Sequence, residues 1–547
     1  MNAKSNPIVI RPDTKIGNIA AENDDEFLFN CFVDHPALAS VLDTTSPQML
    51  VSGRTGSGKT AIIRMVEHQK DHVDKIDLHE LALNYIANSD IIRFLNALDI
   101  DLDLFFQALW KHVLCIEFIR MRFSVKNADD SRGIFSRIRE AFSKNDRKNS
   151  AIKYLENWED KFWITMDTNI REITSKLESQ IGASLGLEVE KFKANAGYSR
   201  TLSAEKRAEV TSRAKKIVNA DQLTELSKVL DLLAEYDQGD KFRQFYILID
   251  RLDEKWVDES IRFSLIRALI ECLKSFRKIP SLKIAVAMRA DVLERVIQES
   301  KDLGFQREKY DDYFLRIVWK KDQLKQLVEK RVNFLYRRKY TSENIHFGDV
   351  FSTNVGRREP FDYMVERTLY RPRDIISFVN LCLTQAQGNS QVTARDIRAA
   401  EGEYSRIRLQ ALEEEWRSAL PSLAVAVRKF AKHGVRFTLG SVSTKDFVED
   451  LVIDIAGIEC PPCDLIANEC AAYLKNQTIP HLLRIAKMVT CELYRIGAIG
   501  IKTGAQERFI YAYQDTPVVS VEMVDTDTRI HIHPMLHRAL NLAEQKV

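Results

Sequence analysis

Short apolar runs alternate with amphipathic stretches along about the first 338 residues of the chain. Runs typical of strands occupy residues 48–52, 73–78, 245–250 and 282–288, and a helix is predicted over 60–69. The last two runs are apolar at nearly every position. Strands of that kind belong to a parallel sheet with helices on both faces. The pattern therefore predicts an α/β domain built on a parallel sheet.

A long, mostly helical stretch separates the second predicted strand from the third, over roughly residues 89–236. Parallel strands need only about a dozen residues for their connection, so we interpret this stretch as an insertion. In its middle, apolar residues recur at helical spacing, at Ile170, Ile173, Leu177, Ile181 and Leu185. That spacing favours a helical hairpin packed on the sheet. An arm for self-association or partner binding is the alternative.

The chain is too long, at 547 residues, for a single hydrophobic core. The pattern predicts four parts, which are listed here: a linker over 1–45, a core with its insertion over 46–338, a helical block over 339–408, and a C-terminal domain over 409–547. The last part begins with helices and ends with predicted strands at 498–501, 509–513 and 518–523. A helix followed by a β-hairpin with a polar tip is the outline of a winged-helix domain.

Composition narrows the class of protein. The chain is 45% apolar and 29% charged, with only 20 Gly and 13 Pro, which is typical of a helix-rich globular protein. Lys and Arg number 80 against 78 Asp and Glu, for a net charge of +2, so any nucleic-acid surface must be a local patch. We find no secretory signal and no apolar run long enough to span a membrane. The eight cysteines are scattered along the chain, and we interpret them as reduced thiols. Because thiols stay reduced in the cytosol, we expect a cytoplasmic protein.

One segment matches the phosphate-loop pattern G-x-x-x-x-G-K-[ST] between a predicted strand and a predicted helix. It reads Gly53, Arg54, Thr55, Gly56, Ser57, Gly58, Lys59 and Thr60. Glycines allow backbone N–H groups to turn inward around phosphates at a helix N-terminus. Lys59 is expected to reach the β- and γ-phosphates, and the Thr60 hydroxyl to bind Mg²⁺. The cofactors predicted by this loop are ATP and Mg²⁺.

A phosphate loop needs an acidic residue at the end of a neighbouring strand. The apolar run at 245–249 leads into Asp250, and Asp253 and Glu254 follow shortly after. We expect Asp250 to hold Mg²⁺, and either Asp253 or Glu254 to orient and deprotonate the attacking water, with Glu254 favoured. The next strand ends at Arg289, which would point at the γ-phosphate if this strand lies between the other two.

Together these motifs resemble the STAND branch of the AAA+-related ATPases, which includes NACHT-type signalling ATPases. Arg371-Pro372-Arg373, at the start of a predicted helix, resembles the second nucleotide sensor in the lid of that superfamily, with Arg373 as the sensor. The segments at 288–293, 316–319 and 370–374 also resemble a little-characterised bacterial P-loop ATPase family often linked to phage-defence loci. Two departures stand out: Arg251 replaces a glycine found in many STAND members, and no repeat array follows the winged helix.

The resemblance implies an ASCE-type P-loop core with a helical lid and a C-terminal winged helix. It also implies a switch that ATP closes through Arg289 and Arg373 and that hydrolysis releases, in bacterial anti-phage defence or stress signalling. We expect a second copy of the chain or an effector protein as the partner, and no membrane. The alternatives are a DNA-dependent ATPase of the initiator or loader type, and a scaffold that binds nucleotide without turnover.

Four further patterns give weaker indications of function. Cys460-Pro461-Pro462-Cys463 has the spacing of half a zinc site but lacks a matching second pair, and the histidines near residue 533 read as a strand-to-helix junction. The basic stretch at 120–148 has interspersed phenylalanines and suits either a packed helix or nucleic acid. In the C-terminal domain, the helix at 482–496 and the hairpin tip offer a thin basic surface. We therefore expect a packing or partner module there, and a nucleic-acid partner is not favoured.

Overall fold

The structure is a computed structural model. It describes residues 8–79, 102–123, 243–299, 307–339, 344–475, 479–503, 508–514 and 519–542, together with scattered helical residues between 179 and 235. The chain forms two compact units. The sheet unit comprises residues 34–54 and 59–317, and the C-terminal unit comprises residues 1–33, 55–58 and 318–547.

A five-stranded parallel sheet organises the sheet unit. Its strands are β1 (Leu50–Gly53), β2 (Val73–Lys75), β3 (Phe245–Ile249), β4 (Leu282–Arg289) and β5 (Phe314–Arg316), in the order β2-β3-β4-β1-β5. Every residue of β3, and all of β4 except its last, is buried, as expected for strands covered on both faces. The four predicted strands are confirmed. The short edge strand β5 was not predicted, because three residues are too few to show an alternation of apolar and polar side chains.

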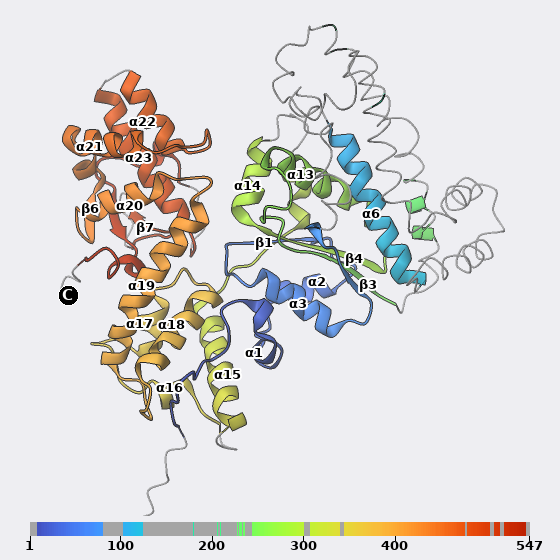
Figure 1. The fold of residues 1–547 in the computed structure, drawn as a ribbon, viewed down its shortest axis with the longest axis horizontal. Coiled ribbons are helices and arrows are strands. Elements are labelled where there is room, and N and C mark those ends of the chain that lie inside the picture. Colours follow the sequence, from blue (N-terminus) through green and yellow to red (C-terminus); the bar gives the residue numbers. More distant parts are fainter. Residues whose placement is uncertain are drawn as a thin grey trace, which may run out of the picture. The chain divides into compact units, whose positions relative to one another are not determined.

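Helices cover both faces of this sheet. Figure 1 shows α2 (Pro36–Leu42) and α3 (Lys59–Gln69) on one side, and α13 (Glu259–Phe276) and α14 (Ala290–Glu299) on the other. The helix α6 (Asp103–Phe123) packs along α13, where the Trp110 Nε1–H donates to the Leu265 carbonyl at 2.9 Å. The sheet unit is therefore the predicted α/β domain.

The helix α6 falls inside the predicted insertion and agrees with its helical character. The apolar series from Ile170 to Leu185, on which the hairpin interpretation rests, lies outside the described residues. So does most of the basic stretch at 120–148, of which only residues 120–123 are described, at the end of α6. The interpretations of both segments stay predictions.

The C-terminal unit is mainly helical. Its helices are α1 (Asp25–Asn30), α15 (Lys321–Lys339), α16 (Phe347–Val350), α17 (Pro360–Val365), α18 (Pro372–Gln385), α19 (Ala394–Trp416), α20 (Leu423–Ala431), α21 (Lys445–Ala456), α22 (Leu465–Lys475) and α23 (Ile479–Ile496). The helix α15 belongs to this unit although the sequence placed it in the core, and α19 runs through the boundary predicted at residue 408. Among the described residues, no helix is long and apolar enough to cross a bilayer.

Much of the segment predicted as a linker over 1–45 is folded. The side chains of Ile8, Ile10 and Ile16 are buried in the core of the C-terminal unit. Asp24 forms a buried ion pair with Arg331 of α15, at 2.7 Å between Oδ2 and Nη2. The sequence pattern missed this packing because residues 11–15, between Ile10 and Ile16, contain no strongly apolar side chain that would extend a pattern.

A three-stranded antiparallel sheet closes the C-terminal unit. It contains β6 (Arg436–Thr438), β7 (Ile499–Lys502) and β8 (Arg529–Ile532) in the order β6-β8-β7. Of the predicted strands, only the one at 498–501 matches. Residues 509–513 contribute a single bridge, between Ile510 and Ile501, and Val521–Met523 is a 3-10 helix. The partner of β7 is instead β8, whose Ile530 and Ile532 supply the buried face.

Candidate nucleotide site

The loop between β1 and α3 has the backbone of a phosphate cradle. Gly56 and Gly58 adopt φ values of 76° and 97°, which residues with side chains rarely adopt. A Cβ at Gly56 would also come within 2.9 Å of the Arg373 Cβ, so this position has no room for a side chain. Glycine at both positions therefore satisfies a geometric requirement of the loop.

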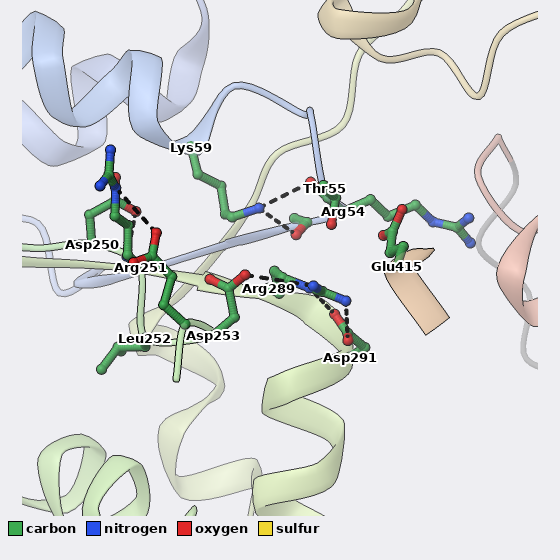
Figure 2. Close-up of polar contacts among 12 residues, drawn as sticks. Arg54, Thr55, Lys59, Asp250, Arg251, Leu252, Asp253, Arg289, Asp291 and Glu415 are labelled. Atoms are coloured by element: carbon green, nitrogen blue, oxygen red, sulfur yellow. Dashed lines mark hydrogen bonds and ion pairs between the residues drawn. The ribbon is translucent and has the colours of Figure 1, made fainter. Parts of the chain in front are cut away.

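Lys59 begins α3, and its side chain folds back over the loop (Figure 2). Its Nζ donates to the carbonyls of Gly53 and Arg54, each at 3.0 Å, and within the described residues it forms no ion pair. Burial lowers its pKa from 10.5 to about 8, and the nearby carboxylate of Asp253 opposes this shift. The loop thus contains a buried ammonium group whose contacts in the described residues are backbone carbonyls. Such a group can bind a phosphate without first breaking an ion pair.

This lowered pKa predicts how ATP affinity depends on pH. Above about pH 8 the free protein carries a neutral Lys59, so binding the anionic phosphates requires uptake of one proton. We expect the ATP affinity to fall roughly tenfold per pH unit between about pH 8 and 9.5. Titration calorimetry in buffers of different ionisation enthalpy measures both the affinity and the proton uptake. An affinity independent of pH over this range would contradict the prediction.

Asp250 follows directly after β3 and lies beside Thr60. Its Oδ1 accepts the Arg251 N–H at 2.8 Å, and the nearby Thr60 side chain acts to lower the pKa of the carboxyl group. The buried Oδ2 has no hydrogen-bond partner in the described part of the chain, and burial raises the pKa of the carboxyl group. A buried carboxylate oxygen without a partner is costly unless a ligand or ion satisfies it.

This pair of oxygens fits a hard divalent cation. Magnesium is bound by one or two protein oxygens together with substrate phosphates, and a hydroxyl and a carboxylate provide such ligands. Thr60 and Asp250 would hold Mg²⁺, which when bound neutralises charge on the phosphates. Thr60 and Asp250 lie near each other in the sheet unit, and their role as magnesium ligands stays a prediction.

The backbone at Arg251 explains one departure noted in the sequence. Arg251 has φ 63°, in the left-handed region where glycine is at ease and other residues are strained. Its Nε lies 3.6 Å from Glu254 Oε1, so its side chain adds a contact that glycine lacks. The position keeps the turn geometry that glycine would favour.

The strand β4 lies between β3 and β1, the arrangement required for Arg289 to point at the site. Arg289 forms a two-pronged ion pair with Asp291, at 2.9 Å from Nε and 2.7 Å from Nη2, and its Nη1 lies 3.6 Å from Asp253 (Figure 2). Glu254 lies 3.5 Å from His79 Nε2. The motifs in the sequence did not predict a role for Asp291 or His79. The close spacing of Arg289 and Asp291 could have indicated their ion pair. The contact of His79 with Glu254 could not be predicted, because the two residues are far apart in the sequence.

The loop tip, Thr55 to Gly58, groups with the C-terminal unit through its backbone contacts. Arg371 Nη1 donates to the Thr55 carbonyl at 2.9 Å, and Trp319 Nε1 donates to the Ser57 carbonyl at 2.7 Å. The hydroxyls of Thr55 and Ser57 are buried without a partner among the described residues. The tip is held by its carbonyls, and two donors remain for a ligand.

The two arginines of Arg371-Pro372-Arg373 have different environments. Arg371 is buried and forms ion pairs with Asp374 at 3.0 Å and Glu415 at 3.4 Å. Arg373 forms no ion pair with a described residue, and burial and the neighbouring Arg371 lower the pKa of its guanidinium group. Arg371 therefore positions the loop, while Arg373 is the cation that an anion would stabilise. The sequence predicted Arg373 as the sensor and missed the role of Arg371.

The histidines near residue 533 form hydrogen bonds with tyrosines. His531 Nδ1 lies 2.6 Å from the Tyr511 hydroxyl, and His533 Nε2 lies 2.7 Å from that of Tyr513. Within the described ranges, no group of three or more His, Cys, Asp or Glu side chains is placed to hold a metal ion. These histidines therefore serve packing in the C-terminal unit.

Comparisons with known proteins give distant similarities. Residues 322–413, which cover most of α15 to α19, match the FunZ-associated C-terminal helical domain. The putative transposon gamma-delta 80.3 kDa protein of Escherichia coli (strain K12) is 21% identical over 554 residues, covering 99% of this chain and 68% of that protein. A Walker-type ATPase of Pyrococcus abyssi aligns over 97% of this chain and 99% of its own, with 13% identity and a TM-score of 0.36.

Proposed function

We propose that this chain binds ATP with Mg²⁺ and hydrolyses it to ADP and phosphate. The observation that carries the proposal is the buried Asp250 Oδ2 near the Thr60 side chain, because this carboxylate oxygen lacks a hydrogen-bond partner among the described residues. Lys59, at the start of the same helix, supplies the cation for the β- and γ-phosphates. These features belong to one unit and come from the two motifs that a P-loop ATPase requires.

Hydrolysis of ATP requires three contributions from the side chains. Lys59 offsets charge on the transferred phosphoryl group, and Arg289 stabilises it once released from Asp291. A carboxylate, Glu254 or Asp253, accepts a proton from the attacking water. The water oxygen forms the new bond to the γ-phosphorus while the bond to the β–γ bridging oxygen breaks. ADP leaves with that oxygen.

We further propose that the ATPase cycle works as a switch. Arg373 supports this idea because it is a cation without an ion-pair partner in the described residues, next to Gly56 of the loop tip. Binding of a triphosphate can shift a conformational equilibrium only by its differential affinity for the two states. A γ-phosphate that contacts Arg373 and Arg289 in one state would give ATP a higher affinity for that state. This difference in affinity is lost when phosphate is released.

The biological setting and the partners are proposals by resemblance. The likeness to STAND and phage-defence ATPases favours bacterial defence or stress signalling, with a second copy of the chain or an effector protein as partner. For the C-terminal domain, the strand order β6-β8-β7 and a long helix before β7 support a winged helix.

A magnesium titration tests the proposed hydrolysis. Asp250→Asn should leave a folded protein that needs roughly 10–100-fold more Mg²⁺ for half-maximal phosphate release, because a charged metal contact is lost. The matched control is Asp231→Asn, which changes an exposed carboxylate paired with Lys278 in the same unit. An unchanged Mg²⁺ requirement in Asp250→Asn would contradict the magnesium site. No phosphate release by the unmodified chain under any condition would favour the scaffold alternative.

A further inference from the structure

The small sheet of the C-terminal unit has one polar face. Arg436 lies opposite His531, which lies opposite Gly500, and Thr438 lies opposite Arg529, which lies opposite Lys502. Directly opposed residues share a face, as do alternate residues along a strand. All six positions therefore belong to one side of the sheet, which we call the basic face. The other side carries the apolar residues Phe437, Ile530, Ile532, Ile499 and Ile501.

Two aromatic rings lie on the basic face. The bridge between Ile510 and Ile501 extends the sheet edge, so Phe509 and Tyr511 share the side of Lys502 and Gly500. The Tyr511 ring lies over Gly500, where a Cβ would come within 2.4 Å of its Cε1. The Arg436 guanidinium lies over the Phe509 ring, 5.7 Å from its centroid, and Phe509 stays partly exposed.

Two arginines of this face are not neutralised by the described residues. Arg436 and Arg529 are exposed, and neither forms an ion pair with a described residue. None of the positions that the register places on the face is acidic, and Asp525 and Asp527 precede β8. The face therefore combines exposed guanidinium groups with a partly exposed aromatic ring.

The helix α23 gives a contrast, because a winged helix would be expected to place this helix against nucleic acid. Arg484 is paired with Glu469 at 2.8 Å, and Arg495 with Glu492 at 2.6 Å. The positive charges of these two arginines, which the sequence predicted as part of a thin basic surface, are therefore balanced by neighbouring glutamates. The strands bring together Arg436 and Arg529, which are far apart along the chain, so the patch is not visible in the sequence.

We propose that the basic face of the β6-β8-β7 sheet binds single-stranded nucleic acid. Arg436 and Arg529 contact phosphates, and the Phe509 ring stacks on a base. Cations along a backbone track combined with an aromatic ring are the features that recognise single strands without sequence preference. The inference goes beyond the proposed hydrolysis of ATP and does not depend on it.

Fluorescence anisotropy with labelled 20-nucleotide oligonucleotides and the full chain tests the proposal. At about 50 mM salt we expect binding of single-stranded DNA or RNA in preference to duplex DNA. The double variant Arg436→Glu with Arg529→Glu should bind at least roughly tenfold more weakly. A milder double variant, Arg436→Gln with Arg529→Gln, should make the slope of log affinity against log salt shallower by about 1.4, since each lost single-strand phosphate contact contributes about 0.7. Phe509→Ala should cost roughly tenfold while leaving the salt slope unchanged.

The matched control is Lys432→Glu with Lys445→Glu, which makes the same charge change at exposed sites of the same unit. Its binding should stay close to that of the unmodified chain. An equal loss in the control, no single-strand binding at about 50 mM salt, or a preference for duplex that the Arg436 and Arg529 variants leave intact would each overturn the proposal. ATP turnover without nucleic acid should be unchanged in all these variants, which separates failure of this inference from failure of the proposed ATPase.

Discussion

Lys59→Ala should reduce ATP affinity by roughly 100-fold or more, the largest effect expected from a single substitution in this chain. The Lys59 Nζ is the side-chain cation at the mouth of the loop, and now rests on the carbonyls of Gly53 and Arg54. Contacts between an ammonium and phosphate oxygens are charge-assisted and are worth about 1.5–3 kcal/mol each. Titration calorimetry with ATP and Mg²⁺ near pH 7 measures the loss.

Lys70→Ala is the matched control, since Lys70 lies just past the end of the same helix and bonds to Gln244. It should leave ATP affinity unchanged. Lys59→Ala should not unfold the free protein, because a buried ammonium with a lowered pKa is itself unfavourable in the fold. Unchanged affinity in a folded Lys59→Ala protein would refute the assignment of residues 53–60 as a phosphate loop.

The parts of the fold that the sequence predicts are those with a strong local signal. The strands β3 and β4 are apolar at nearly every position because both faces are covered, and the loop before Lys59 needs glycine at two positive φ angles. These requirements act on adjacent residues and are readable without tertiary structure. The predicted pairing of Thr60 with Asp250 follows from them, since the ends of parallel strands meet at one edge of a sheet.

The short strands lacked such a signal. The strands β5 and β6 have three residues each, too few to show a period, and β6 exists because it pairs with β8. At 509–513 the alternating pattern was real, but Tyr511 and Tyr513 bond to histidines of the neighbouring strand segment and the backbone makes only one bridge. Pairing between distant segments decided these elements.

The site residues that were missed are those whose role comes from a distant partner. Arg371 was adjacent to the predicted sensor, yet its role appears only through Asp374, Glu415 and the carbonyl of Thr55. Its ion pairs fill its donors and keep its direction fixed, which a sequence motif cannot report. Arg373 lacks such pairs among the described residues, so the distinction between a positioning arginine and a ligand-binding arginine is a structural result.

The identity of the catalytic base is the remaining choice between neighbours. Asp253 lies 3.6 Å from Arg289 and is the carboxylate with the strongest influence on Lys59. The Asp253 carboxylate therefore helps to hold the side chains of Arg289 and Lys59 in position. Glu254 lies at similar distances from its partners, 3.5 Å from His79 and 3.6 Å from Arg251, but its side chain is 44% exposed against 30% for Asp253. A carboxylate that can reorient and reach water is the better base, which favours Glu254.

Glu254→Gln should therefore keep ATP affinity within about twofold and lower turnover by roughly 10²-fold or more, because the amide keeps the shape and cannot accept the proton. Asp253→Asn should act differently: it removes a carboxylate beside Lys59 and Arg289, so ATP affinity should change along with turnover. Calorimetry and steady-state phosphate release on both variants separate the cases, with Glu67→Gln on the exposed side of α3 as the control. If Asp253→Asn abolishes turnover with normal ATP binding while Glu254→Gln stays active, the base is Asp253, and the greater exposure of Glu254 reflects only its position at the surface.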